Sequence, residues 1–448
     1  MERSDRTDNL ILLIDDYGRE SKLLHESLIA AGIDVKAITI DDDGFLPDGV
    51  CSIYDIAMGM GENDSEGRAL YFNEVTVPEY WEISSDNRVG KVHEYNVQRA
   101  AIYYALPRHK RQVRIVEWND ASGHVRLSEH YDKKGNLFAK TAFNSKGQKV
   151  NRTWFSKDGA ETVNENYVTG SVIYTRDGKD HIFRDKTGFM VYVLKEAGFG
   201  ESIFYINSLS YPLFVSLRLK RDKKKDILFW QEGIRESIPG NMNIILNGES
   251  FDIKKIVVQD KDAYDRFISL GADKNIMSCR GYIYPFAREN RLTKKALICT
   301  NSDQILHMEE MVKSLPDVHF YIAAITEMSS KLLALEEYEN VSLYPGVKEA
   351  TLEKLLGECD IYLDINRYDE IADILFRAFL QNMAIFAFKE TEHNPSFVAD
   401  TNIYPSDEWR TVVNEVNKCL NDETYMKSLI DKQHEKALSE SKDGYTGL

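Results

Sequence analysis

The sequence contains few cysteines, and none of them stands in a paired motif. Among 448 residues there are five, all far apart and without any Cys-x-x-Cys: Cys51, Cys279, Cys299, Cys359 and Cys419. This pattern excludes a disulfide framework and a zinc ribbon and favours reduced thiols. Because His-Glu-x-x-His, Gly-x-Ser-x-Gly and phosphate-loop motifs are also absent, metalloprotease, serine hydrolase and nucleotidase chemistry has no support. We therefore expect neither a metal site nor a cofactor.

Long hydrophobic runs and an excess of positive charge are missing as well. The amino-terminal apolar run, Leu10–Ile14, is too short for a signal core or a membrane span. Counting 56 basic against 72 acidic side chains leaves a net charge of −16, which repels nucleic acid and anionic lipid. We expect a cytoplasmic protein with no nucleic-acid partner. One basic cluster is compatible with a solvated loop or with peripheral contact at the inner face of the cell membrane: Arg218, Lys220, Arg221, Lys223, Lys224 and Lys225.

The length predicts two or three domains, since 448 residues is about three times a typical domain. Short apolar runs alternating with helix-period stretches predict an α/β fold with two doubly wound, Rossmann-like units facing each other across a cleft. We place the first unit at residues 1–59 and 191–286, around an insertion at 60–190, and the second at 287–448. The last helix is expected at 408–420, followed by a polar tail that frays from about Gln433.

The apolar and helical periods also predict individual elements. In the first unit, strands are expected at 10–14, 35–40, 202–206, 226–230 and 256–258, and helices at 20–31, 211–219 and 262–270. Gly32 is expected to end the first of these helices. In the second unit, strands are expected at 296–300, 319–324, 341–344, 361–365 and 384–388.

The insertion carries a twelve-residue repeat. Four glycines recur at this interval, Gly123, Gly135, Gly147 and Gly159, and so do four aromatic residues, Tyr131, Phe143, Phe155 and Tyr167. One repeat fits a strand plus a turn whose glycine takes a positive φ, which predicts an extended antiparallel sheet with the aromatics stacked along one face. Such a sheet must be covered by the rest of the chain or by another subunit. We favour a partner subunit, with the four aromatics at the interface.

The carboxyl-terminal unit resembles the donor-binding half of GT-B glycosyltransferases. In their retaining members, a motif E-x7-E followed by A-x-x-x-G-x-P-V-I places one carboxylate on the donor sugar and another on the ribose. Residues 369–386 fall on this frame without a gap, but Asp369 and Arg377 stand at the glutamates and Asn382 at the glycine. Because a guanidinium only donates hydrogen bonds, Arg377 cannot accept from ribose hydroxyls. The resemblance therefore implies a degenerate donor site.

The loop after the first strand of this unit departs from the family pattern too. Family enzymes present an arginine and a lysine to the donor diphosphate from this loop, whereas residues 300–304 contain no cation and one acid, Asp303. A pseudoenzyme is favoured. The alternative is an active retaining glycosyltransferase with an altered motif, in which Asp369 still touches the sugar. An adhesion module is a third class, against which the reduced cysteines and the lack of an export signal argue.

The whole chain resembles the GtfB family of glycosyltransferase-stabilising subunits. The resemblance rests on residues 41–48, 227–232 and 238–242 together with the β-insertion. It implies a non-catalytic subunit in a heterotetramer of two catalytic and two accessory chains. That complex adds N-acetylglucosamine to Ser and Thr of serine-rich repeat adhesins before their export by an accessory Sec system. In this family the accessory chain is thought to hold the unfolded acceptor.

Acceptor-binding residues are predicted from position alone. Asp15, Asp16 and Tyr17 follow the first strand, and His393 and Asn394 follow the last predicted strand of the second unit, where α/β folds bind ligands. Asp43 and Phe45 are added from the resembling stretch 41–48. A plain solvated turn remains the alternative for residues 15–18 and 393–395.

Overall fold

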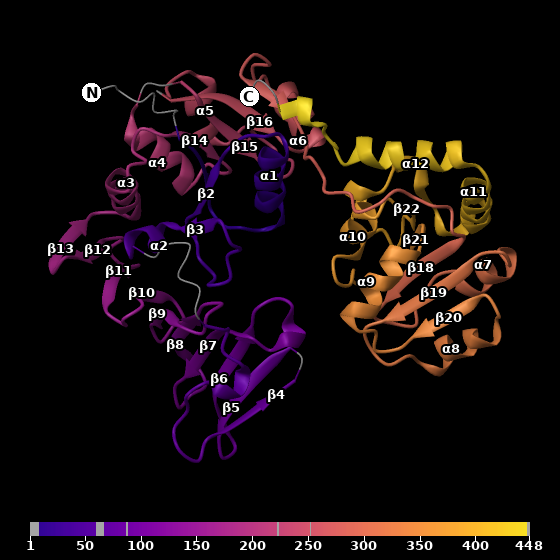
Figure 1. Cartoon of the computed structure of the whole chain (residues 1–448), viewed down its shortest axis with the longest axis horizontal. Coiled ribbons are helices and arrows are strands. Elements are labelled where there is room, and N and C mark those ends of the chain that lie inside the picture. The colour runs from indigo at the N-terminus through magenta and orange to yellow at the C-terminus, as the bar shows by residue number, and fades with distance from the viewer. Residues whose placement is uncertain (1–8, 60–66, 87, 222–223, 251, 446–448) are drawn as a thin grey trace. The chain divides into compact units, whose positions relative to one another are not determined.

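The computed structural model describes residues 9–59, 67–86, 88–221, 224–250 and 252–445, and it divides into two compact units after Cys279 (Figure 1). The first unit holds a parallel sheet and a long antiparallel sheet, and the second holds one parallel sheet. The boundary predicted between 59 and 60 adjoins residues outside the described ranges. The boundary predicted at 190 falls inside a helix, α3 (Lys186–Glu196).

The first parallel sheet has the Rossmann strand order, β17-β16-β15-β14-β1-β2-β3. Its apolar runs are buried on both faces, as parallel strands between helices require. The strands are β1 (Leu10–Ile14), β2 (Lys36–Thr39), β3 (Val50–Ser52), β14 (Ile203–Ile206), β15 (Asp226–Trp230), β16 (Ile253–Val258) and β17 (Met277–Cys279). The helices besides α3 are α1 (Arg19–Ala30), α2 (Ile53–Ala57), α4 (Tyr211–Leu219), α5 (Gly240–Leu246) and α6 (Lys261–Ser269). The predicted elements at 10–14, 211–219 and 226–230 are confirmed residue for residue, and Gly32 ends α1 with φ 80°.

The insertion between β3 and β14 is one antiparallel meander of ten strands in chain order. The strands are β4 (Glu82–Ser85), β5 (Val89–Glu94), β6 (Val97–Tyr104), β7 (Val113–Asn119), β8 (Val125–Tyr131), β9 (Leu137–Phe143), β10 (Lys149–Phe155), β11 (Glu161–Asn166), β12 (Val172–Arg176) and β13 (Lys179–Phe183). Each repeat glycine lies in the turn between two strands with φ between 73° and 89°. The prediction of one strand plus one glycine turn per repeat is confirmed.

The expectation that the repeat aromatics stack along one face is wrong. Each of them ends a strand or follows it, and consecutive strands of a meander run in opposite directions, so the aromatics alternate between the two ends of the sheet. Their surroundings differ too. Tyr131 packs with the apolar cluster of β5–β7, whereas the Tyr167 hydroxyl donates to Glu165 beside α2. The twelve-residue period therefore records the turns and not a shared face.

The chain itself covers part of this sheet, on opposite faces at its two ends. Tyr54 of α2 stacks on Trp154 of β10, with ring centroids 3.6 Å apart. Trp154 pairs across strands with Ala139, whereas Ala142 belongs to the cross-strand row that leads through Leu127, Trp118 and Ala100 to Val92. Val92 lies in the second cluster, which the segment before β4 covers. Because Ala139 and Ala142 are three residues apart in one strand, the two covered rows lie on opposite faces.

The second unit repeats the Rossmann order as β20-β19-β18-β21-β22-β23. Its strands are β18 (Lys295–Thr300), β19 (His319–Ala324), β20 (Val341–Tyr344), β21 (Ile361–Asp364), β22 (Ala384–Phe388) and β23 (Ile403–Tyr404). Its helices are α7 (Met308–Ser314), α8 (Ser330–Leu333), α9 (Glu349–Glu358), α10 (Ile374–Leu380), α11 (Trp409–Asn421) and α12 (Glu423–Lys436). No helix in the described ranges is both long and apolar enough to cross a bilayer.

The predicted end of the chain is wrong in two respects. Helix α11 is not the last, because α12 follows it after one residue. The tail does not fray at Gln433, whose side chain is fully buried: it accepts from the Ile385 N–H at 2.7 Å and donates to the Met383 carbonyl at 3.0 Å. Tyr445 is also buried and donates to the Gly281 carbonyl. These polar residues satisfy buried backbone groups, so their polarity does not indicate exposure.

Candidate functional site

The arginine of the donor frame is held by two glutamates of its own chain. Arg377, on α10, donates to Glu349 and Glu353 of α9 at 2.6 Å each, and its side chain is only 18% exposed. Asp369 is exposed, and its backbone carbonyl accepts from the Asn301 side chain at 3.4 Å. The residues at the two motif positions thus have different partners. Arg377 neutralises carboxylates where the family motif has a carboxylate free to accept from a ligand.

The sequence analysis missed a neighbouring carboxylate, Glu370, which is partly buried and hydrogen-bonded. Helix α10 begins only at Ile374, after Ala372 and Asp373 in the left-handed region. Glu370 is half-buried and accepts from the Leu375 N–H at 2.9 Å, and burial raises the pKa of its carboxyl. The frame of the motif places its first carboxylate one residue earlier, so spacing alone could not identify Glu370.

His393 is fixed at the carboxyl-terminal end of β21. Its Nδ1 lies 2.6 Å from the Asp364 carboxylate, its backbone N–H donates to the same group at 3.0 Å, and its Nε2 contacts the Tyr368 carbonyl. Both ring nitrogens face acceptors, and the hydrogen bond to Asp364 raises the His393 pKa. Asn394 is half-exposed, and its backbone carbonyl accepts from Phe397. The ring of His393 is therefore engaged within the chain.

The loop after β18 lacks a cation of its own, but one ammonium group from another element contacts it. The Lys331 ammonium of α8 donates to the Asp303 carbonyl at 3.2 Å, and the Arg367 backbone N–H donates to the Gln304 carbonyl at 3.0 Å. Sequence reasoning missed Lys331, because it lies 28 residues from its acceptor. Within the described ranges, no group of three or more His, Cys, Asp or Glu side chains is placed to hold a metal ion.

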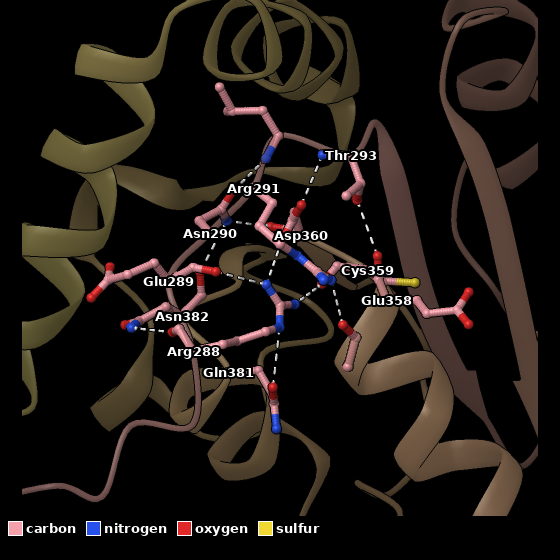
Figure 2. A network of polar contacts seen from close by, with 12 residues as sticks. Arg288, Glu289, Asn290, Arg291, Thr293, Glu358, Cys359, Asp360, Gln381 and Asn382 are labelled. Carbon is pink, nitrogen blue, oxygen red and sulfur yellow. Dashed lines mark hydrogen bonds and ion pairs between the residues drawn. The ribbon is translucent and has the colours of Figure 1, made fainter.

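Asn382, which stands at the glycine position of the donor motif, takes part in a structural network of polar contacts (Figure 2). It follows α10 with φ 52°, the left-handed conformation that glycine adopts at helix ends. Its amide donates to the Arg288 carbonyl at 2.7 Å, and Arg288 in turn donates to the Asp360 carboxylate at 2.5 Å. Asp360 precedes β21, so this network lies at the amino-terminal edge of the sheet, opposite the edge where such folds bind ligands.

At the carboxyl-terminal edge of the first parallel sheet, the three predicted residues have different surroundings. Asp15 borders an open depression of about 950 Å³ formed with the loops after β14 and β15, and burial raises the pKa of its carboxyl. Asp16 is exposed and accepts from the Gly18 N–H at 2.9 Å. The Tyr17 hydroxyl lies 2.8 Å from His25 Nδ1 on α1, and burial raises the pKa of this tyrosine to about 12.

Asp43 and Phe45 lie in the loop between β2 and β3, which contacts the inserted sheet. The Lys133 N–H donates to the Gly44 carbonyl at 2.7 Å, and the Lys133 ammonium pairs with Asp48 at 2.7 Å. The Asp43 carboxylate accepts from the Phe45 N–H at 2.9 Å and lies 3.9 Å from the Arg114 guanidinium. Loop 41–49 and turn 132–135 together form what we call the sheet joint.

The basic cluster is not a uniform cationic surface. Arg221 is 1% exposed and pairs with Asp226 and with Asp252, and Arg218 pairs with Asp185 at 2.6 Å. Lys223 lies outside the described residues. Two of the six predicted cations are thus neutralised by carboxylates, which removes much of the attraction to anionic lipid.

Two parallel sheets of Rossmann order, with an antiparallel insertion in the first, define a protein of the GT-B glycosyltransferase fold. The fold is shared with the pneumococcal O-GlcNAc transferase GtfA in complex with UDP and GlcNAc, at TM-score 0.52 and 13% identity over 96% of each chain. Four family models match this chain. They are the GtfB N-terminal domain at residues 11–56, the GtfB middle domain at 81–184, the GtfB third domain at 186–270 and the GftB/GlyA-F C-terminal domain at 296–433.

The chain belongs to the GtfB family. It is 38% identical to the UDP-N-acetylglucosamine–peptide N-acetylglucosaminyltransferase stabilizing protein GtfB of Streptococcus agalactiae over 97% of this chain and 98% of that protein. A chain in the crystal structure of the GtfA/B complex bound to UDP and GlcNAc matches with TM-score 0.91 and 38% identity, over 97% of this chain and 98% of that one.

Proposed function

We propose that this protein is a non-catalytic subunit that stabilises a UDP-N-acetylglucosamine–peptide N-acetylglucosaminyltransferase and binds its acceptor. The support is family membership over almost the whole chain, with relatives named for stabilising such an enzyme. The proposed complex has two catalytic and two accessory chains, and the proposed acceptor is an unfolded serine-rich repeat adhesin, modified in the cytoplasm before export through an accessory Sec system. The small number of cysteines and the lack of any Cys-x-x-Cys are compatible with a reducing compartment. Peripheral contact with the inner face of the membrane remains part of this proposal.

The observation that carries the non-catalytic role is the pairing of Arg377. A retaining enzyme needs a carboxylate there to accept from the ribose, and this chain instead has a guanidinium that already donates to Glu349 and Glu353. Restoring a carboxylate at 377 would set three acids against one another. Asn382 shows how this part of the motif can have a structural role without donor binding. Its left-handed backbone ends α10, and its side chain hydrogen-bonds to the Arg288 carbonyl.

Donor binding and transfer by the purified chain test this role. With labelled UDP-N-acetylglucosamine and a serine-rich peptide, we expect no transfer and no saturable donor binding by the chain alone, and both with the co-expressed catalytic partner. Transfer by the isolated chain at a rate above that of a heat-denatured sample would refute the proposal.

The alternative, an active retaining glycosyltransferase with an altered motif, is favoured by one observation. The Lys331 ammonium contacts the loop after β18, where family enzymes place their diphosphate-binding cations. The same transfer assay decides between the two functions. If activity is found, Lys331→Ala should lower it, because a donor diphosphate needs a cation there.

The inserted sheet is the proposed interface with the catalytic partner. Of its four repeat aromatics, Phe143 and Phe155 are half-exposed, whereas Tyr131 and Tyr167 hydrogen-bond to Glu129 and Glu165. Placing a charge in an apolar interface leaves it desolvated, so Phe155→Asp should reduce co-purification of the partner by roughly tenfold. The control is Ile29→Asp, on an exposed position of α1. Equal recovery with both variants would reject the sheet as the interface.

A further inference from the structure

The depression beside Asp15 has the properties of a built binding site. It lies at the carboxyl-terminal ends of β1, β14 and β15, where the strand order reverses direction and ligands of doubly wound folds bind. Amide side chains of Asn207, Gln231 and Gln259 link the ends of β14, β15 and β16. Asn207 also accepts from the Asp15 N–H at 3.1 Å. Hydrogen bonds among these amide side chains therefore fix the backbone position of Asp15.

The lining contains a half-buried acceptor, Asp15, and a buried donor, Trp230. The Asp15 carboxylate hydrogen-bonds with Ser208, and burial raises its pKa. The indole of Trp230, 1% exposed, lines the same depression, and its N–H has no partner among the described residues. An unpaired buried donor is rare in a folded protein and costs free energy until a ligand or a water molecule accepts from it. A hydroxyl group can donate to Asp15 and accept from an N–H at once.

Charge excludes an anionic ligand from this depression. Three carboxylates, Asp15, Glu232 and Glu236, line it against one cation, Arg235, which pairs with Glu232. The remaining polar lining is uncharged and consists of serine hydroxyls and an amide: Ser208, Ser210, Ser237 and Asn241. Phe214 and Ile234 are 39% and 61% exposed and offer apolar contact beside these groups. The chemistry fits an uncharged, hydroxyl-rich chain and not a nucleotide or phosphate.

The volume favours a stretch of polypeptide over one small group. About 950 Å³ is at the upper end of small-molecule sites, and the depression is open to solvent, so an extended chain can enter and leave along it. We propose that this depression holds several residues of an extended polypeptide rich in serine and threonine, and that Asp15 reads one of their hydroxyls. The proposal rests on the acceptor-binding role proposed above and assigns it to the first α/β unit.

Peptide binding by the complete complex tests this assignment. The full chain is co-expressed with its catalytic partner, and binding of a labelled serine-rich peptide is compared by fluorescence polarisation with that of a peptide in which every serine is alanine. We expect the native complex to prefer the serine peptide, and Asp15→Asn to weaken that binding roughly fivefold, since a neutral acceptor replaces a charged one. The control, Asp34→Asn, changes an exposed residue at the opposite edge of the same sheet and should leave binding unchanged.

The outcomes separate this assignment from the proposed function. If the native complex prefers the serine peptide and Asp15→Asn keeps the full preference, the site is elsewhere and the acceptor role survives. If the native complex binds neither peptide, both fail. Tighter binding of a lysine-substituted peptide would identify a cation site and overturn hydroxyl recognition. Should Asp15→Asn fail to assemble, Phe214→Ala, at an exposed position of α4, must still weaken peptide binding for the proposal to stand.

Discussion

Replacing Asp360 by asparagine should destabilise the second unit strongly, although the two side chains have the same shape. Asp360 is fully buried ahead of β21, where its carboxylate accepts from Arg288 Nη1 at 2.5 Å and from the Thr293 N–H at 2.8 Å (Figure 2). Both partners belong to the segment that leads into β18. Asparagine keeps the shape but turns an NH2 group toward one of these donors and leaves the Arg288 charge without its counter-ion.

The magnitude follows from the burial of the pair. Removing one partner of a buried, hydrogen-bonded ion pair costs about 3–5 kcal/mol, because the other charge stays in the interior. For a unit of this size, each kcal/mol lowers Tm by roughly 2–4 °C, so we expect a decrease of about 10 °C. Calorimetry of the full chain measures this directly, with Asp407→Asn, an exposed position of the same unit, as the control. A Tm within about 2 °C of the native value would refute the reasoning.

The pH dependence gives an independent check of the same pair. Burial alone would raise the pKa of Asp360, but hydrogen bonds from Thr293 and Arg288 lower it by more. A carboxyl whose folded pKa is lowered contributes stability above its unfolded pKa and loses it as pH falls through the folded value. The difference between native and Asp360→Asn protein should therefore be constant from about pH 5 to 8 and shrink below about pH 4. A constant difference down to pH 2 would contradict the ionic origin of the effect.

Two further predictions concern the sheet joint. Gly44→Ala should cost roughly 2–4 kcal/mol of unfolding free energy, because φ is 81° and a Cβ would lie 2.5 Å from the Tyr131 carbonyl. The control, Gly49→Ala, has φ 85° and open space around the Cβ, so it should cost only the roughly 1 kcal/mol of backbone strain. Equal costs for the two variants in urea denaturation would show that the close approach at Gly44 does not matter. Burial and the adjacent Asp55 raise the pKa of Asp42 to about 7. The native protein should therefore lose stability relative to the Asp42→Asn variant as pH rises from about 4 to about 7, and the difference in stability should be constant above about pH 7. Parallel profiles of Tm against pH for the two proteins would contradict this.

The parallel strands could be predicted because both of their faces are buried. A run such as Leu10–Ile14 has to be apolar throughout, and this leaves a signal in the sequence whatever packs on it. The turns of the insertion were predictable for a similar reason, since each needs a positive φ that glycine provides at Gly123 and its repeats. In both cases a local physical requirement restricts the local residue type.

Contacts between distant segments could not be predicted in this way. The pairing of Arg377 with Glu349 and Glu353 joins residues 28 and 24 positions apart, and Lys331 reaches its loop from another helix. Gln433 resembles a solvent-exposed residue until its two backbone partners, Ile385 of β22 and Met383 just before it, are known. For the candidate site, the sequence identified Asp15 through strand position, but the depression, the Trp230 donor and the excess of acid depend on loops that meet only in three dimensions.

The change of covered face along the inserted sheet constrains how that sheet can move or mispair. Strand β9 contributes Ala139 to the side that rests on α2 and Ala142 to the row continuous with the far cluster, so both hydrophobic clusters fix the same hydrogen-bond register. A slip by one residue would turn both sets of apolar side chains toward water together. Each cluster therefore guards the register of the other, and a mispaired meander would expose both at once.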